Sequence, residues 1–260
     1  MKHFIDKENI LGLQKYNCKG DLMKIISFTN YKNIIVEFQD EFKYQVKTTF
    51  VLFQKGEITN KFGRHICGIG YLGNTSSSNN NKTKKSYYIW SSIIKRCYDN
   101  KVINKHFSYN GCTVCKEWEC YENFEKWYNI HYYNCPIGGK MCVDKDILFK
   151  GNKIYSPETC CIVPNEINCL LTKSDKIRGN LPIGINLWKN KLHVQMSKII
   201  DNKKVKVHLG YFNKNEIDLA FNKYKQEKEK YIKEEANKFK AYIPNNVYNA
   251  LINYKIEITD

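Results

Sequence analysis

MCVDKDILFKGNKIYSPETCCIVPNEINCLL, residues 141–171, places two aspartates on either side of a lysine at the end of a short apolar run. Its pattern predicts a strand over 141–147, a loop over 148–157 and a second strand over 159–163. Proline is favoured at the first helical position, because the N–H that it lacks would be unpaired there, so Pro164 predicts a helix start. The stretch therefore predicts a strand, a turn, a second strand and a helix.

Two stretches upstream of this unit carry large apolar residues at helical spacing. Such a stripe is typical of the packing face of a helix, and we expect both stretches to be core helices. The stripes consist of Tyr87, Trp90, Ile94 and Cys97, and of Trp118, Tyr121, Phe124 and Tyr128.

The N-terminal part contains strand-like runs at 23–28, 33–38 and 43–48, separated by turn residues. These runs predict a small β-barrel or meander within residues 1–72, with no function indicated by its residues. Residues 73–86, GNTSSSNNNKTKKS, are polar and predict a flexible linker.

The C-terminal part alternates regularly between apolar and polar residues. The alternation predicts three strands with one apolar face, and Asn213 followed by Glu216 predicts a capped helix that covers that face. The apolar positions are Ile183, Ile185, Leu187, Leu192, Val194, Met196, Val205, Val207 and Leu209 in the strands, and Ile217, Ala220, Phe221 and Tyr224 in the helix. With the other parts, this predicts an α+β protein.

The opposite sheet face presents cations, hydrogen-bond donors and one tryptophan. Residues 176–214 hold nine Lys or Arg against one acidic residue. A small sheet with such a face fits the major groove and DNA phosphates, although a merely solvated face is the simpler alternative. The face comprises Asn186, Trp188, Lys191, His193, Gln195, Lys204, Lys206 and His208.

The whole chain of 260 residues is basic, with a formal net charge of +16, which favours a polyanionic partner. Double-stranded DNA is preferred over RNA, because the cationic sheet lacks the paired surface aromatics that stack RNA bases. No run of 18 apolar residues occurs, so we expect no membrane association and an intracellular, cytoplasmic protein.

Eleven cysteines without a secretory signal favour free thiols over a disulfide framework. Cys112 and Cys115, with Cys120 nearby, have part of the spacing of a structural Zn²⁺ site. Because no second clean pair of ligands follows, buried thiols are the preferred interpretation.

Two family resemblances are specific. PIGINLWKNKLHVQM, KVHLGYF and NEIDLAFNKYKQEKE, within residues 181–232, resemble the plant ethylene-response-factor type of DNA-binding domain. YYIWSSIIKRCYD, CKEWECYENFEKWY and VDKDILFKGNKIYSPETCCIVPNEIN, within 87–172, resemble HNH endonucleases of phages and mobile elements, which have a ββα-metal fold. The resemblance implies a homing-type or phage enzyme in an infected host.

The predicted organisation has five ranges. These are an accessory β module (1–72), a linker (73–86), a ββα-metal nuclease domain (87–175), a DNA-binding domain (181–240) and a tail (241–260).

The HNH resemblance implies a role for three residues. The position of Asp144 holds a divalent metal in that family, the position of Lys145 lies beside the attacked phosphate, and the position of Asn168 completes the site. Oxygen and amide ligands suit Mg²⁺ or Mn²⁺.

Lys145 stands where most HNH enzymes have a histidine base, and a lysine between two aspartates is a poor base at neutral pH. We assign it to the phosphate. Metal hydroxide, Asp146 or His131 remain alternatives for activating water. Two simpler interpretations stay open, namely a charged edge strand and a non-catalytic DNA-binding regulator with a degenerate HNH scaffold.

Overall fold

The computed structural model describes residues 10–172, 180–200 and 203–260 and shows a mixed α+β protein with several small sheets. Contacts divide the chain into two compact units, residues 1–130 with 153–156 (unit 1) and residues 131–152 with 157–260 (unit 2). The five ranges expected from the sequence have other boundaries and stay predictions. The end of the expected nuclease range, residue 175, lies outside the described residues. Within the described residues, no helix combines the length and apolar character needed to cross a membrane.

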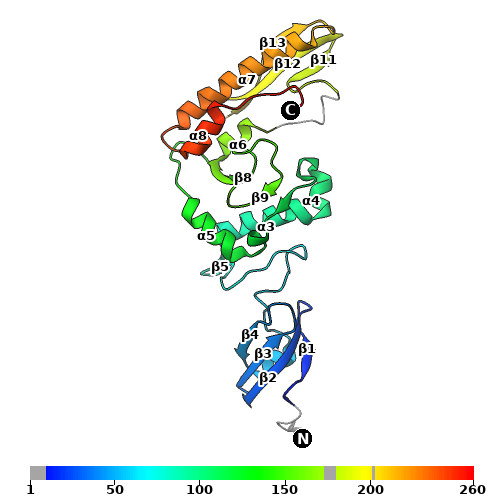
Figure 1. The fold of residues 1–260 in the computed structure, drawn as a ribbon, viewed down its shortest axis with the longest axis vertical. Coiled ribbons are helices and arrows are strands. Elements are labelled where there is room, and N and C mark those ends of the chain that lie inside the picture. Colours follow the sequence, from blue (N-terminus) through cyan, green and yellow to red (C-terminus); the bar gives the residue numbers. More distant parts are fainter. Residues whose placement is uncertain (1–9, 173–179, 201–202) are drawn as a thin grey trace. The chain divides into compact units, whose positions relative to one another are not determined.

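Unit 1 begins with four antiparallel strands that pair in chain order, which is a meander (Figure 1). They are β1 (Gln14–Tyr16), β2 (Leu22–Asn30), β3 (Asn33–Phe38) and β4 (Gln45–Thr48), followed by helix α2 (Phe50–Lys55). Alternate residues of β2 and β3 are buried and pack with Phe50 and Phe53 of α2. The apolar residues at alternate positions of these strands therefore form the core of this part.

The rest of unit 1 consists mainly of helices. They are α3 (Lys85–Tyr98), α4 (Asn100–Lys105), η1 (Phe107–Tyr109), η2 (Lys116–Glu119) and α5 (Tyr121–His131), joined by the short parallel pair β7 (Thr113–Val114) and β9 (Ile154–Tyr155). The expected stripes form the core: Trp90 and Ile94 of α3 and Trp118, Tyr121 and Phe124 are buried. Trp118 lies in η2 rather than in the helix α5.

Residues 73–86 are not the flexible linker that their composition predicted. Strands β5 (Ser78–Asn79) and β6 (Lys82–Thr83) form a hairpin there. Three bonds fix the stretch to α5: Asn74 N–H donates to Glu122, Thr75 hydroxyl to Glu125, and Lys84 pairs with Glu125. Carboxylates on α5 thus supply the partners that the polar side chains need, which composition alone does not show.

Unit 2 contains the strands and the helix predicted from residues 141–171, whereas residues 153–156 of the expected loop belong to unit 1. Strand β8 (Met141–Asp144) pairs antiparallel with β10 (Cys161–Pro164), and helix α6 (Asn165–Leu170) follows with Pro164 at its N-cap. The predicted order is therefore present, but the first strand ends at Asp144 rather than at residue 147. Strand β9, inside the expected loop, was not predicted.

The C-terminal part of unit 2 is a three-stranded antiparallel sheet with a long helix along one face (Figure 1). The sheet consists of β11 (Ile185–Trp188), β12 (Lys191–Ile200) and β13 (Lys203–Phe212), and the helices are α7 (Ile217–Phe239) and α8 (Asn245–Ile252). Ile185, Leu192, Val194 and Met196 are buried towards Ala220, Phe221 and Tyr224. The alternation of apolar residues thus correctly predicted which residues of the central strand β12 are buried.

Gly184 shows how closely helix and sheet approach. Its φ is +81°, and a Cβ atom there would lie 2.0 Å from the ring of Tyr224. Only glycine avoids both the backbone strain and the clash.

Three expectations for this part were wrong at the edges of the sheet. Leu187 is 54% exposed and Val205 is 41% exposed, although both were expected in the core. Ile217, at the start of α7, is also exposed. Helix α7 begins after Glu216, whose carboxylate accepts from the Asn213 N–H, so only half of the predicted capping box forms.

Candidate active site and nucleic-acid interface

Asp144 ends strand β8 and closes a tight turn. Its Oδ1 accepts hydrogen bonds of 2.9 Å from the backbone N–H groups of Asp146 and Ile147. An aspartate that bonds to the backbone two and three residues ahead favours a turn over a continued strand. The strand therefore stops at the residue predicted to hold a metal, and Asp146 is brought back towards it.

The two carboxyl groups interact with each other. Burial, and then the charge of Asp146, raise the pKa of Asp144 to about 6. Two carboxylates that share a site resist simultaneous ionisation unless a cation lies between them. The pair is therefore a place where a positive charge is stabilised.

Lys145 supplies one such charge from within the protein. Its Nζ lies 3.2 Å from Asp146 Oδ2, and its side chain is 10% exposed. The side chain of Asn152 donates a 2.7 Å hydrogen bond to the Lys145 carbonyl, which closes the loop after β8. The pairing of Lys145 with Asp146 does not favour the direct phosphate contact that we expected for this lysine.

The other two predicted catalytic residues have no described hydrogen bond to Asp144. Asn168 is half-buried on α6, and no hydrogen bond joins its side chain to Asp144 or Lys145. His131 is the exposed last residue of α5, again with no described bond to Asp144. Described bonds join Asp144, Lys145 and Asp146 into one cluster, and the roles of Asn168 and His131 stay predictions.

The C-terminal segment, expected as a tail, adds residues to this cluster. Lys150 Nζ lies 2.7 Å from Asp260 Oδ2 and 5.3 Å from the ring centroid of Tyr254. Burial, followed by the charges of Asp260, Asp146 and Asp144, raises the pKa of Tyr254 above its ordinary range. Tyr254 therefore lies within electrostatic reach of the aspartate pair.

The donor set at the end of β8 fits a hard divalent cation in part. Asp144 and Asp146 offer carboxylate oxygens, the ligand type that Mg²⁺ and Mn²⁺ prefer, and a cation there would offset their mutual repulsion. Among residues 10–172, 180–200 and 203–260, no group of three or more His, Cys, Asp or Glu side chains is arranged for a metal. A cation would thus depend on two carboxylates together with water or substrate oxygens.

The eight predicted DNA-contacting residues, which we call the outer face, share one side of the sheet. Cross-strand partners include Asn186 with His193, Trp188 with Lys191, and Gln195 with His208. Lys204 and Lys206 continue the row along β13. Trp188 is 53% exposed, and the lysines 191, 204 and 206 are exposed as well.

A cluster of three rings at the centre of the outer face includes Tyr211, which was not predicted. His193 Nε2 and His208 Nδ1 are 2.8 Å apart, and the Tyr211 ring lies 4.9 Å and 4.6 Å from the two imidazole centroids. Strict alternation from Val205 would place residue 211 on the helix side. A bulge at Leu209 reverses the alternation, and Gly210 beside it has a φ of +144°.

Two electrostatic details mark this face. Burial, then His208 and Lys206, lower the pKa of His193. The side-chain oxygen of Asn186 is buried without a hydrogen-bond partner in the described part of the chain. A donor from a ligand would pair this acceptor, and an unpaired buried acceptor costs about 1–3 kcal/mol.

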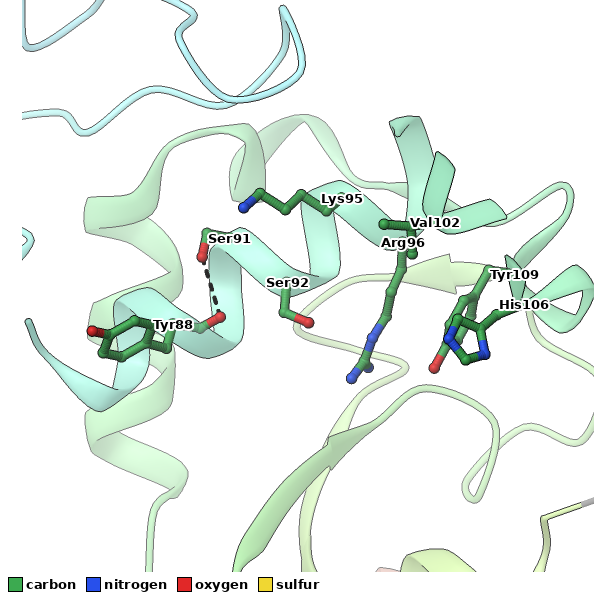
Figure 2. Close-up of a pocket in the computed structure, with 8 residues that line it drawn as sticks. All are labelled: Tyr88, Ser91, Ser92, Lys95, Arg96, Val102, His106 and Tyr109. Carbon is green, nitrogen blue, oxygen red and sulfur yellow. Dashed lines mark hydrogen bonds between the residues drawn. The ribbon is translucent and has the colours of Figure 1, made fainter. Parts of the chain in front are cut away.

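Unit 1 has a cationic pocket of its own, with a cavity of about 460 Å³ between α3 and the α4–η1 segment. Figure 2 shows Arg96 extending from α3 on the same side as Tyr109, with Lys95 and Ser92 on the same helix. Arg96 lies 5.2 Å from the Tyr109 ring centroid and also bonds to Tyr155. The apolar spacing of α3 predicted only its core face, whereas its other side carries Lys95 and Arg96.

None of the eleven cysteines, all in the described residues, forms a disulfide, and burial raises the pKa of Cys161, which pairs with Asp144 across the strands. Comparisons with protein-family models, with curated proteins and with solved structures found no match for this chain. Its function is therefore inferred from its own residues and their geometry.

Proposed function

We propose that this chain is a metal-dependent DNA endonuclease of the phage or homing HNH kind. It binds double-stranded DNA with the outer face and hydrolyses phosphodiester bonds at the end of β8. The observation that carries this is the convergence of Asp144 and Asp146 beside Lys145, in the same compact unit as the outer face. A carboxylate pair that can hold a divalent cation would supply the charge neutralisation and the activated water that phosphodiester hydrolysis needs.

The residues of the cluster have different roles in this proposal. Asp144 and Asp146 would hold Mg²⁺ or Mn²⁺, and the ion would supply charge neutralisation at the phosphate and an activated water. The turn that Asp144 closes fixes the direction of its carboxylate, and Lys145 positions Asp146. Asn168 stays a predicted ligand from α6. The ethylene-response-factor resemblance and the ββα-metal identity of β8, β10 and α6 belong to the same proposal.

The outer face supports DNA binding by its chemistry. Exposed lysines supply phosphate contacts, and His193, Gln195 and Asn186 supply hydrogen-bonding groups for base edges. The pocket with Lys95 and Arg96 adds cations in unit 1. Together with the net charge of +16, these features favour a nucleic-acid partner over a small substrate.

One observation favours a second function, that of a non-catalytic DNA-binding regulator. The Asp144 carboxylate already accepts two backbone hydrogen bonds, and the Lys145 ammonium already has a partner in Asp146. Such a cluster can also serve only to stabilise the turn after β8. In this alternative the outer face binds DNA and no bond is broken.

One assay separates the two functions. The purified chain is incubated with supercoiled plasmid and with AT-rich linear DNA, in Mg²⁺, Mn²⁺ or EDTA, and the products are resolved on gels. The endonuclease proposal expects nicks or breaks with either metal and none with EDTA. Tight binding without cutting in any metal would instead support the regulator.

A further inference from the structure

A second cavity, in unit 2, is lined by residues from four different elements. Its volume is about 230 Å³. The lining comprises Asn165, Cys169 and Leu170 of α6, Ser197, Lys198 and Ile199 of β12, Lys204 of β13, and Lys228 and Tyr231 of α7. Three of these residues are lysines, and none is a carboxylate.

The three lysines come from β12, β13 and α7, and all three line this cavity; Lys204, an exposed residue of the outer face, lies at its rim. In the described part of the chain, Lys198, Lys204 and Lys228 have no ion-pair partner. Glu227 interacts with Lys198 only through space, and its carboxylate bonds to Lys223 at 2.9 Å. Three lysines that line one cavity without an ion-pair partner in the described residues favour an anion there.

Tyr231 organises two of these cations. Lys198 Nζ lies 5.0 Å and Lys228 Nζ 5.5 Å from the centroid of its ring. The ring is fixed by its hydroxyl, which accepts a 2.8 Å hydrogen bond from the Ile199 N–H. A ring face offsets part of the repulsion between the two ammonium groups and keeps them in position.

Lys228 shows the cost of this arrangement. Burial, followed by the charges of Lys204 and Lys198, lowers its pKa to about 8. A lysine that served only to cover apolar surface would extend its charge into solvent instead. A bound anion would reverse the effect and restore the charged form.

We propose that this cavity binds a phosphate group through Lys198, Lys204 and Lys228. Phosphate carries enough charge and enough oxygens for three ammonium groups, whereas a carboxylate has only two oxygens and one charge. Ser197 and Asn165 line the same cavity and can add neutral hydrogen bonds. The phosphate is either a group of the DNA backbone or a free phosphate compound, and the site does not depend on the proposed cutting activity.

The test begins with inorganic phosphate and pyrophosphate as probes. Calorimetry and NMR of the lysine side chains are applied to the full chain and to Lys228→Met, which keeps the apolar stem. The matched control is Lys230→Met, an exposed lysine of α7 outside the cavity. Wild type and the control should bind phosphate, and the affinity of Lys228→Met should be lower by about tenfold or more.

A second arm identifies the source of the phosphate. The affinity for a DNA duplex is measured against salt for the same three proteins. If the backbone enters the cavity, Lys228→Met should reduce the slope of log K against log salt by about 0.9. An unchanged slope with lost phosphate binding assigns the cavity to a free phosphate compound.

The folding of each variant is checked by its thermal transition, and Lys228→Arg should retain phosphate binding because it keeps the charge. Equal phosphate binding by wild type and Lys228→Met, or no binding by folded wild type, would overturn the proposal.

Discussion

The outer face and the end of β8 use charged residues in opposite ways. On the outer face, Lys191 and Lys206 extend into solvent without described ion pairs. At the end of β8, Lys145 is buried and its charge is paired with Asp146. The difference indicates that the first region is prepared for an external anion, whereas the second is a closed cluster whose charges hold one another in place.

The largest effect should come from Asp144→Asn. Asparagine keeps the Oδ1 acceptor for the turn but loses the charge that attracts a cation, so the cleavage rate should fall about a hundredfold or more. The rate is measured on supercoiled DNA with Mg²⁺. Asp218→Asn, an equal charge change at an exposed position of α7, should leave the rate unchanged. Equal cleavage rates for Asp144→Asn and wild type would show that Asp144 is not a metal ligand needed for cutting.

Gly184→Ala should show how much the close packing of α7 against the sheet that carries the outer face stabilises the fold. The new Cβ meets the Tyr224 ring, and the φ of +81° adds strain, so unfolding free energy should fall by about 2–5 kcal/mol. Denaturant unfolding measures the loss. Gly111→Ala has a similar φ but open space, and should cost only about 1–2 kcal/mol. Equal losses in both variants would show that the contact with Tyr224 has no energetic role.

A double replacement on the outer face should weaken DNA binding without changing the fold. Lys191→Ala with Lys206→Ala removes two exposed cations, so the slope of log K against log salt should fall by about 1.8. Filter binding at several salt concentrations gives the slope. Lys214→Ala with Lys240→Ala, two exposed lysines outside the face, serves as the control. The same slope in all three proteins would place DNA elsewhere.

The smallest effect concerns pH. The pKa of His193 is lower in the folded protein than in the unfolded chain, so the unfolded chain takes up the proton at higher pH. Folding stability should therefore fall as the pH drops below 6.5. Nearby DNA phosphates favour the protonated ring, so DNA affinity should instead rise severalfold between pH 7.5 and 5.5. His193→Gln should lose part of both trends, whereas His65→Gln should keep them. A pH-independent affinity in wild type would exclude His193 from the interface.

The two regions also differ in how far their structure could be predicted. Alternation is a local property, and it correctly placed the buried residues of β12 and the eight residues of the outer face. It failed where local rules are interrupted, because the bulge at Leu209 moved Tyr211 to the outer face. It also failed at Leu187, an apolar position of the pattern that is exposed.

The end of β8 was harder to predict, because its geometry depends on a turn and on distant residues. The pattern over 141–147 indicated a continuous strand, but hydrogen bonds from Asp146 and Ile147 to Asp144 end it earlier. Tyr254 and Asp260 approach the loop from the C-terminal segment, and no sequence spacing connects them with Asp144. The cluster of three residues was therefore predictable, but its surroundings were not.

The central claim is that binding and cutting use separate surfaces of unit 2. The most direct test measures the Kd and the cleavage rate at saturating protein on one labelled duplex, for wild type, Asp144→Asn, the Lys191/Lys206 double variant and their combination. We predict that Asp144→Asn changes only the rate, that the double variant changes only the Kd, and that the combination shows both changes independently. If Asp144→Asn weakens binding as much as cutting, or if the lysine variant lowers the rate at saturation, the two surfaces act as one site and the account is contradicted.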